Sequence, residues 1–310
     1  METNQAYIVI DMTSIYKNKQ KTFIHTPDIY EKIVPGLSIT TDHEVELITE
    51  EIMEIYSSIV EFDRKEAHQN PSNHSKTVFQ RLDRLIALDI SNGTAEAILS
   101  NSGLNSAFDA ITAFRSRYTA ELETREAESI LNSSDPWAAL ESFTYIPNYI
   151  QLARTEYEGA RLKAGDSVVF LGSGPLPLSL IVLCRQHGLG GIGVEQEPER
   201  AELSRRVLER LELSERIRII EGNHLMLPMK EMPELIMVAA QAEPKKEIFD
   251  HLAELLPAGT KISYRIYEKG LRRILDTFSR YELPERFKEC QRVRPTPPVN
   301  NTVVFLTVPE

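Results

Sequence analysis

Two glycines and two prolines follow an apolar, strand-like run in the stretch VVFLGSGPLPLSLIVLC, residues 168–184. Gly172 and Gly174 can adopt positive φ and let the backbone approach a ligand closely, with Ser173 between them as a further contact. Pro175 suits the first turn of a helix, where its missing N–H is not needed. A dinucleotide fingerprint would place a third glycine in this turn, so its absence argues against a pyrophosphate ligand. Alone, such a turn is equally compatible with a structural role.

Polar side chains follow at the ends of the next strand-like runs. Glu195 ends GGIGVE and lies 21 residues after Gly174, the separation at which an acidic side chain accepts hydrogen bonds from ribose hydroxyls. Asn223 follows RIRIIEG and either contacts an adenine edge or belongs to an ordinary turn, and Ala240 ends ELIMVAA. We therefore predict an adenosyl ligand held by Gly172–Pro175, Glu195, Asn223 and Ala240. S-adenosylmethionine (SAM) is the obvious member of that class.

These residues need a parallel sheet whose strands all end at one edge. After residue 163, the runs DSVVFLG, GGIGVEQ, RIRIIEG, ELIMVAA and TKISYRI alternate with helical segments, and NTVVFLTV follows near the end. Alternation of this kind predicts an α/β fold with helices on both faces of the sheet. Ligands of such sheets bind at the carboxyl ends of the strands. We predict a Rossmann-like parallel sheet of the SAM-dependent methyltransferase type over residues 161–310.

The preceding part of the chain has helical periodicity. HEVELITEEIMEIYSSIVEF, VFQRLDRLIALDI and AFDAITAFRSRYTAELETREAESIL are the three strongest runs, and the polar loop DRKEAHQNPSNHSK separates the first two. We predict an N-terminal helical domain that binds substrate over residues 46–160. Residues 1–45 mix β-like pieces with turn signals and are predicted only as an extension.

The composition limits the class of partner. The 310 residues are 42% hydrophobic and 26% charged, as expected of a globular protein. The net charge of −11 argues against nucleic acid or an anionic membrane as the main partner. No run reaches the roughly 20 apolar residues of a membrane helix, and the first residues lack a signal-peptide pattern, so we expect a cytoplasmic protein. The histidines and cysteines show no metal-ligand spacing, so no metal is predicted, and Cys184 is expected to be a buried free thiol.

Three motifs together resemble one family. FLGSGPLPLSLIVL resembles the nicotianamine synthase signature, in which a strand leads into G-S-G-P-L-P-L and an apolar helix. DPWAALESFTYIPNYIQLARTEYEGA is similar to that family's F-P-Y-Y-x-N-Y segment, and YRIYEKGLRRIL resembles its arginine-containing strand followed by G-L-R. The resemblance spans roughly residues 110–308. Thr144 and Ile146 depart from the plant pattern and resemble the bacterial and archaeal branch, which includes enzymes of staphylopine-type opine metallophore pathways.

The resemblance implies an aminobutanoyltransferase. In this family an amine attacks the γ-carbon of the methionine part of SAM, 5′-methylthioadenosine leaves, and a 3-amino-3-carboxypropyl group is transferred. The staphylopine-type enzymes transfer one unit to histidine, whereas the plant enzymes join three units. The expected small-molecule acceptor is therefore an amino acid, histidine first, in metallophore biosynthesis. The resemblance also leads us to expect a homodimer.

The resemblance places a catalytic base on the helix before FTYIPNY, residues 143–149, which we call the tyrosine segment. Glu121 in YTAELE is the first candidate, and Glu128 is the alternative because short deletions blur the alignment. Most glutamates on a helix face are solvated, and a pair of Glu121 with Arg125 would contribute only about 0.2–0.5 kcal/mol. Tyr145 corresponds to the first tyrosine of the family motif. It has two possible roles: it positions a substrate group, the amine or the carboxylate, or it is a residue of the hydrophobic core.

Four further residues are candidate substrate contacts by the same resemblance. Asn148 and Tyr149 belong to the tyrosine segment. Glu156, on the following helix, either binds an amino group or caps a neighbouring element. Arg265, in the strand ISYRI, either grips a carboxylate bidentately or forms a structural ion pair.

Two other functions stay open at this point, because a fold alone does not fix the chemistry. A small-molecule methyltransferase on the same fold would release S-adenosylhomocysteine instead of methylthioadenosine. A non-enzymatic nucleotide-binding module would bind an adenosyl ligand without turnover, and the intact FTYIPNY block argues against it.

Overall fold

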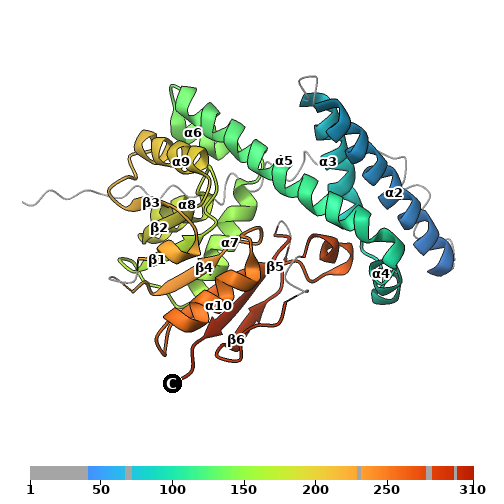
Figure 1. Cartoon of the computed structure of the whole chain (residues 1–310). Coiled ribbons are helices and arrows are strands. Elements are labelled where there is room, and N and C mark those ends of the chain that lie inside the picture. Colours follow the sequence, from blue (N-terminus) through green and yellow to red (C-terminus); the bar gives the residue numbers. More distant parts are fainter. Residues whose placement is uncertain (1–40, 67–71, 229–231, 277–280, 297–298) are drawn as a thin grey trace, which may run out of the picture. The chain divides into compact units, whose positions relative to one another are not determined.

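The computed structural model describes residues 41–310 except 67–71, 229–231, 277–280 and 297–298 (Figure 1). The predicted extension, residues 1–45, lies almost wholly outside the described residues. Residues Val45–Glu310 form one compact unit. The boundary proposed near residue 160 stays a prediction about the organisation within that unit.

The first part of the described chain is helical, as its periodicity predicts. Its elements are α2 Thr41–Glu66, α3 Ser72–Ile86, α4 Asn92–Leu99, the 3₁₀ turn η1 Ser102–Leu104, α5 Asn105–Asn132, α6 Pro136–Ser142 and α7 Ile146–Gly159. The predicted loop between the first two helices is shorter than expected, because α2 continues through Glu66 and α3 begins at Ser72. Asp135 caps α6 by accepting a 3.0 Å hydrogen bond from the Ala138 N–H.

The second part carries a seven-stranded sheet. Its strands are β1 Ser167–Leu171, β2 Gly190–Glu195, β3 Ile217–Glu221, β4 Leu235–Val238, β5 Lys261–Ile266, β6 Lys288–Val293 and β7 Thr302–Thr307. The connecting elements are α8 Leu178–His187, α9 Pro198–Arg210, η2 His224–Met226, α10 Lys245–Leu255 and η3 Gly270–Leu275. The strand order is β3-β2-β1-β4-β5-β7-β6. The order reverses direction at β1, which places the β1–α8 turn where such sheets bind ligands.

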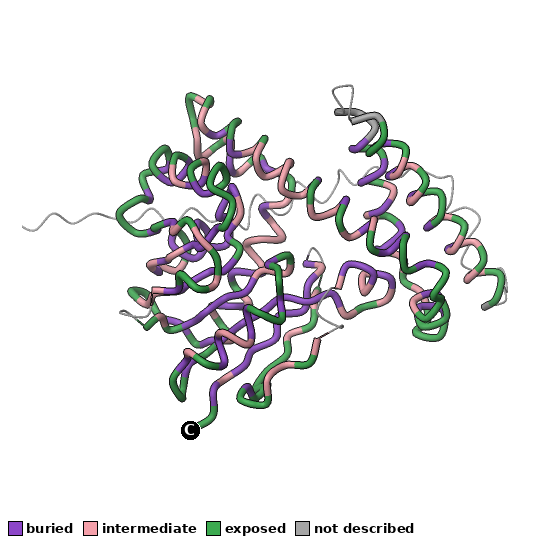
Figure 2. The backbone as a smooth tube through the Cα atoms, in the orientation of Figure 1, coloured by how far each residue is buried: buried purple, intermediate pink, exposed green. Residues whose placement is uncertain are grey.

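The sheet confirms the predicted α/β fold, and beyond its parallel strands it includes one antiparallel strand. β1 to β5 pair in parallel, whereas β7 runs antiparallel to both β5 and β6. β6 was not predicted because its sequence, KECQRV, has no apolar alternation. Its residues are mostly exposed, as the colour of the backbone shows along this edge of the sheet in Figure 2. A charged edge strand of this kind resists pairing with another chain.

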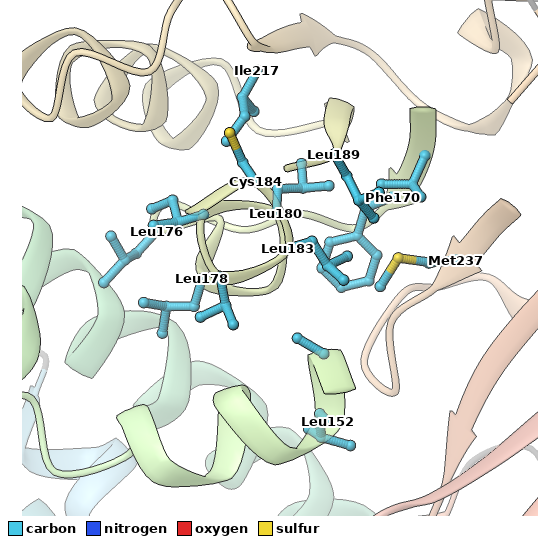
Figure 3. Packing of buried hydrophobic residues seen from close by; sticks show 14 of the residues in the cluster. Leu152, Phe170, Leu176, Leu178, Leu180, Leu183, Cys184, Leu189, Ile217 and Met237 are labelled. Carbon is cyan, nitrogen blue, oxygen red and sulfur yellow. The ribbon is translucent and has the colours of Figure 1, made fainter. Parts of the chain in front are cut away.

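Alternate residues of β1 enter two different cores. Val168 and Phe170 pack with α8, whereas Val169 and Leu171 pack in the cluster that contains α10. Helix α8 is buried from Leu178 to Cys184, and Figure 3 shows Leu183 of this helix beside Phe170. Cys184 is a buried free thiol, as predicted. The apolar runs of the sequence therefore fix the position of the β1–α8 turn from both sides.

The helical part has a core of its own, which one segment from the second part completes. Ile52, Ile55, Phe108 and Ile111 belong to this core, and Tyr267, Leu271, Ile274 and Leu275 from η3 and its approach pack into it. The Thr112 hydroxyl on α5 donates a 2.9 Å hydrogen bond to the Ile274 carbonyl. Helix α5 is thus joined directly to η3.

Candidate active site

The β1–α8 turn has the backbone conformation that its glycines predict. Gly172 has φ +77° and Gly174 has φ +74°, values that other residues rarely adopt. The N–H groups of Gly172 and Ser173 donate to the Val194 carbonyl at 2.9 and 3.2 Å. The Gly174 N–H donates to Oε2 of Glu195 at 2.9 Å. Because Pro175 has no N–H, none of these four residues has a free N–H for a phosphate group, which such sites bind through backbone N–H groups.

Glu195 ends β2 and is 5% exposed. One of its oxygens accepts the hydrogen bond from Gly174, and the other accepts a 3.0 Å bond from the Glu197 N–H. This carboxylate therefore holds the β1–α8 turn, residues 172–175 and called the glycine turn from here on, in place. Each oxygen keeps a second lone pair, which can accept a hydroxyl from a ribose. The role predicted for Glu195 is compatible with this geometry and stays a prediction.

A carboxylate from α5 reaches the glycine turn, and it belongs to Glu123. Its Oε2 would lie 2.9 Å from a Cβ atom at Gly174, so a side chain at this position would displace the carboxylate. Its Oε1 accepts a 2.6 Å hydrogen bond from the hydroxyl of Tyr149 on α7. Burial, reinforced by the charge of Glu195, raises the pKa of Glu123 to about 7, although the Tyr149 hydrogen bond opposes this shift. Glu123 can therefore exchange a proton near neutral pH.

Tyr149 remains protonated and able to donate this hydrogen bond. Burial raises the pKa of its phenol well above the usual value, and the adjacent Glu123 carboxylate raises it further. Tyr145, one turn earlier, lies at the N-cap of α7 and packs edge-on against Phe143 with ring centroids 5.4 Å apart. Burial raises the pKa of Tyr145 to about 12. Asn148, between the two tyrosines, has a buried Oδ1 without a hydrogen-bond partner in the described part of the chain.

The two glutamates that the resemblance favoured lie on another face of α5. Glu121 is half-exposed and pairs with Arg125 at 3.2 Å, and Glu128 is exposed. Neither contacts the glycine turn through an ion pair or hydrogen bond that the structure shows. The geometry thus brings Glu123, and not Glu121 or Glu128, to Gly174 and Tyr149.

Glu156 and Arg265 pair with each other. The Arg265 guanidinium donates to both carboxylate oxygens of Glu156 at 2.9 and 2.8 Å, and to the Ser179 hydroxyl at 2.8 Å. Glu156 is 1% exposed and Arg265 is 5% exposed. The guanidinium also lies over the Phe170 ring, 5.1 Å from its centroid. Of the two roles considered for Arg265, the structure shows the ion pair, which ties α7 to β5 and α8.

The remaining predicted contacts lie around the same edge of the sheet. Ser173 is buried, and its hydroxyl has no hydrogen-bond partner among the described residues. Asn223 caps η2 by accepting a 3.0 Å hydrogen bond from the Leu225 N–H, the turn role that was one of its two readings. Ala240 follows β4 and is half-buried. Its carbonyl accepts a 2.9 Å hydrogen bond from Lys245.

Sequence reasoning missed Lys245, a buried cation behind the predicted ligand edge. Its ammonium donates to the carbonyls of Ala239, Ala240 and Ala242 and so fixes the loop after β4. Burial lowers the pKa of Lys245 to about 8. Nothing in the local pattern distinguishes this lysine from its neighbour Lys246, which is exposed.

Sequence reasoning also missed Glu123, although helical spacing contained a signal. Glu123 shares a helical stripe with Ala127 and Ile130, at i, i+4 and i+7, and both are fully buried. Glu121 instead shares the stripe of Arg125 and Glu128. The apolar stripe therefore indicated which glutamate faces the protein.

No group of three or more histidine, cysteine, aspartate or glutamate side chains is arranged to hold a metal ion among the described residues. No helix in the described ranges has the length and apolar character required to cross a membrane.

The chain is similar to a known protein family and to solved structures of other proteins. The family described as nicotianamine synthase protein matches residues 41–309. The crystal structure of MtNAS in complex with MTA and tNA has a TM-score of 0.74 and 31% sequence identity, covering 84% of this chain and 98% of that chain. A glutamate-to-glutamine mutant of MtNAS in complex with S-adenosylmethionine has a TM-score of 0.72, 30% identity and the same coverage.

Curated relatives match over shorter stretches. The L-histidine 2-aminobutanoyltransferase of Yersinia pestis is 26% identical over 138 residues, which is 43% of this chain and 49% of that protein. Nicotianamine synthase 3 of Oryza sativa subsp. indica is 41% identical over 71 residues, 21% of each chain. The match thus spans about half of the bacterial relative and about a fifth of the plant enzyme.

Proposed function

This chain belongs to the nicotianamine synthase family, and on that premise we propose that it transfers the 3-amino-3-carboxypropyl (aminobutanoyl) group of SAM to the amine of an amino acid. 5′-Methylthioadenosine is the by-product. The observation that carries the proposal is the Glu123 carboxylate, with a pKa of about 7, beside a glycine turn whose backbone N–H groups are already occupied.

The turn and its two carboxylates suit a sulfonium donor better than a phosphate-bearing cofactor. The N–H groups of Gly172, Ser173 and Gly174 are all donated within the protein. Glu123 and Glu195 add negative charge, which repels a pyrophosphate and attracts the positive sulfur of SAM. Glu195 accepts ribose hydroxyls through its remaining lone pairs, and Asn223 and Ala240 contact the adenosine at the same edge of the sheet.

The reaction is a displacement at carbon. The lone pair of the acceptor amine attacks the γ-carbon of the methionine part, a new C–N bond forms, and the C–S bond breaks. The bonding pair returns to sulfur, so the sulfonium becomes the neutral thioether of methylthioadenosine. Which of the three carbons attached to sulfur reacts depends on which one the protein holds in line with the amine, within about 3–3.5 Å.

Glu123 takes the proton that the amine must lose. An amino-acid amine is protonated near neutral pH and is not a nucleophile in that state. A carboxylate with a pKa of about 7 is sufficiently basic to accept its proton and is still largely ionised above that pH. The Tyr149 hydroxyl orients the carboxylate through its 2.6 Å hydrogen bond. Glu123 therefore replaces Glu121 as the proposed base.

Histidine is the proposed acceptor, and metallophore biosynthesis is the proposed role of the product. The support is the histidine aminobutanoyltransferase of Yersinia pestis, together with the departures of Thr144 and Ile146 from the plant motif. Tyr145 and Asn148 lie one turn or less from Tyr149 on α7 and are the proposed contacts of this acceptor.

The test is to identify the nucleoside that the purified full-length protein releases from SAM in the presence of single amino acids. Methylthioadenosine, formed only with an acceptor and fastest with histidine, is the expected result. Release of S-adenosylhomocysteine would instead show a methyltransferase. Binding of SAM without turnover across all amino acids would show a binding module.

A further inference from the structure

Two arginines, Arg115 and Arg272, lie near each other where η3 packs against the helical part of the chain. Arg115 lies on α5, and Arg272 lies on η3, which packs against both α3 and α5. Asp83, on α3, forms an ion pair with Arg115. Three elements that are far apart in the sequence therefore converge on one cluster of charges.

Arg115 is fixed by its neighbours, and one of its buried N–H groups has no hydrogen-bond partner among the described residues. Its side chain is 12% exposed, and its guanidinium carbon lies 5.1 Å from the centroid of the Phe79 ring. One terminal nitrogen contacts Asp83, but the buried Nε has no hydrogen-bond partner among the described residues. An unpartnered buried donor is costly. A ligand with an acceptor oxygen would satisfy it.

Arg272 is not paired within the part of the chain that the structure describes. It is half-buried, and the structure shows no ion pair or hydrogen bond between its side chain and the described part of the chain. Burial lowers the pKa of Arg272, and the positive charge of Arg115 lowers it further. The next residue, Arg273, is different, because it forms a 3.0 Å ion pair with Glu96. Arg272 is therefore the unmatched cation of this pair of neighbours.

Among the described residues, the charges of this cluster do not balance. Arg115 and Arg272 contribute two positive charges, and Asp83 contributes one negative charge. The nearby Tyr145 phenol, with a pKa of about 12, is uncharged at neutral pH. We propose that Arg115 and Arg272 form the binding site for the α-carboxylate of an amino-acid substrate. This site rests on the proposed function and adds to it the group that selects amino acids from other amines.

The cluster and Glu123 are connected through the same helix, α5. Arg115 precedes Glu123 by eight residues, about 12 Å along the helix axis at about 1.5 Å per residue. Each of these two residues interacts with a tyrosine of α7 or its N-cap. Tyr145 interacts electrostatically with Arg115, and Tyr149, one turn later, hydrogen-bonds to Glu123. The arginine cluster and Glu123 thus both border the segment of the chain that runs from Tyr145 to Tyr149.

Both the amino-acid acceptor and the methionine part of SAM carry an α-carboxylate that could bind this site. The arginine cluster lies against the helical core, whereas the glycine turn lies at the sheet. This separation favours the acceptor as the molecule whose carboxylate binds the two arginines. Methylthioadenosine, which has no carboxylate, distinguishes loss of the site from general damage to the adenosyl pocket.

The experiment compares Arg272→Gln, Arg272→Lys and the matched control Arg273→Gln in the full-length protein. We expect Arg272→Gln to raise the KM for histidine by about 10- to 100-fold, the range for a lost hydrogen bond to a charged group. The dissociation constants of methylthioadenosine and SAM should stay within about twofold, and Arg272→Lys should restore part of the loss. Arg273→Gln should leave all these constants unchanged.

Decarboxylated substrate provides a second readout. The wild-type protein should prefer histidine over histamine, and Arg272→Gln should lose most of that preference. If SAM binding alone weakens while methylthioadenosine binding is kept, the site holds a carboxylate, but that of the donor. The proposal is overturned if histidine and SAM both bind Arg272→Gln normally, or if methylthioadenosine binding is lost as well and Arg272→Lys does not restore it.

Failure of this proposal can be told apart from failure of the proposed function. If the wild-type protein forms no methylthioadenosine with any amino acid, the proposed transfer is wrong. Calorimetric binding of histidine, SAM and methylthioadenosine to wild type and Arg272→Gln still tests the carboxylate site in that case.

Discussion

Tyr149 donates a 2.6 Å hydrogen bond to Glu123 and so joins α7 to α5 at the point where both helices approach the glycine turn. The other oxygen of the same carboxylate lies so close to Gly174 that a Cβ atom there would be 2.9 Å away. One carboxylate therefore contacts the helical part, the tyrosine segment and the β1–α8 turn. Its raised pKa follows from this enclosed position.

Glu123→Gln should lower kcat by about 100- to 10,000-fold, because removal of a general base costs about this much. The glutamine keeps the size of the side chain and can still accept the Tyr149 hydrogen bond, so the arrangement of α5 and α7 should be kept. Glu121→Gln is the matched control on the same helix, since Glu121 pairs only with the exposed Arg125. Steady-state kinetics of both variants provide the measurement, and equal losses in the two would contradict the assignment of the base.

The activity should fall as the pH drops below about 7, where Glu123 becomes protonated. Tyr149→Phe removes a hydrogen bond that lowers the pKa of Glu123, so the pKa should rise further. The acidic limb of the kcat/KM profile should therefore move to higher pH in this variant. The acceptor amine titrates equally in both proteins and cancels in the comparison. A limb that stays in place or moves to lower pH would show that Glu123 does not control it.

Gly174→Ala and Gly165→Ala should cost similar stability but different activity. Both glycines have positive φ, +74° and +93°, so alanine should lower the free energy of unfolding by about 1–2 kcal/mol at either position. Only at Gly174 does the new methyl group meet the Glu123 carboxylate, since no atom lies within 4 Å at Gly165. Denaturant unfolding and kcat should be measured together. Undiminished kcat in Gly174→Ala would be inconsistent with a catalytic Glu123 at this position.

Glu156→Gln should destabilise the fold by about 3–5 kcal/mol, because it leaves the charge of Arg265 buried and unpaired. Glu158→Gln, on the same helix, breaks an exposed pair with Arg154 and should cost less than about 1 kcal/mol. Urea unfolding of both variants tests the difference. Full stability of Glu156→Gln together with weakened substrate binding would favour the ligand role that the sequence also allowed for Glu156 and Arg265.

The sheet and its ligand turn could be predicted because their signals are local. The apolar run before Gly172 and the glycines themselves specify a buried strand and a tight turn. The polar strand β6 gives no such signal, because an edge strand with mostly exposed side chains needs no apolar alternation. The antiparallel direction of β7 was missed as well, since strand direction depends on pairing partners remote in the sequence.

The site was harder to predict where its contacts are long-range. Glu156 and Arg265 were both recognised as candidates, but their pairing joins residues 109 positions apart. The motif resemblance points to Glu121, whereas the buried stripe of Ala127 and Ile130 points to Glu123. The cluster of Arg115, Asp83 and Arg272 depends on three elements whose packing no single stretch of sequence specifies.

The account depends on which carbon of SAM is transferred, and a single-turnover mass measurement tests this directly. SAM labelled either in the methyl group or in the aminocarboxypropyl chain is mixed with the protein and histidine, and the mass of the amino-acid product is recorded. Label in the product only from the aminocarboxypropyl chain, with unlabelled methylthioadenosine from the same reaction, is the predicted result. Label in the product from the methyl group would contradict the account.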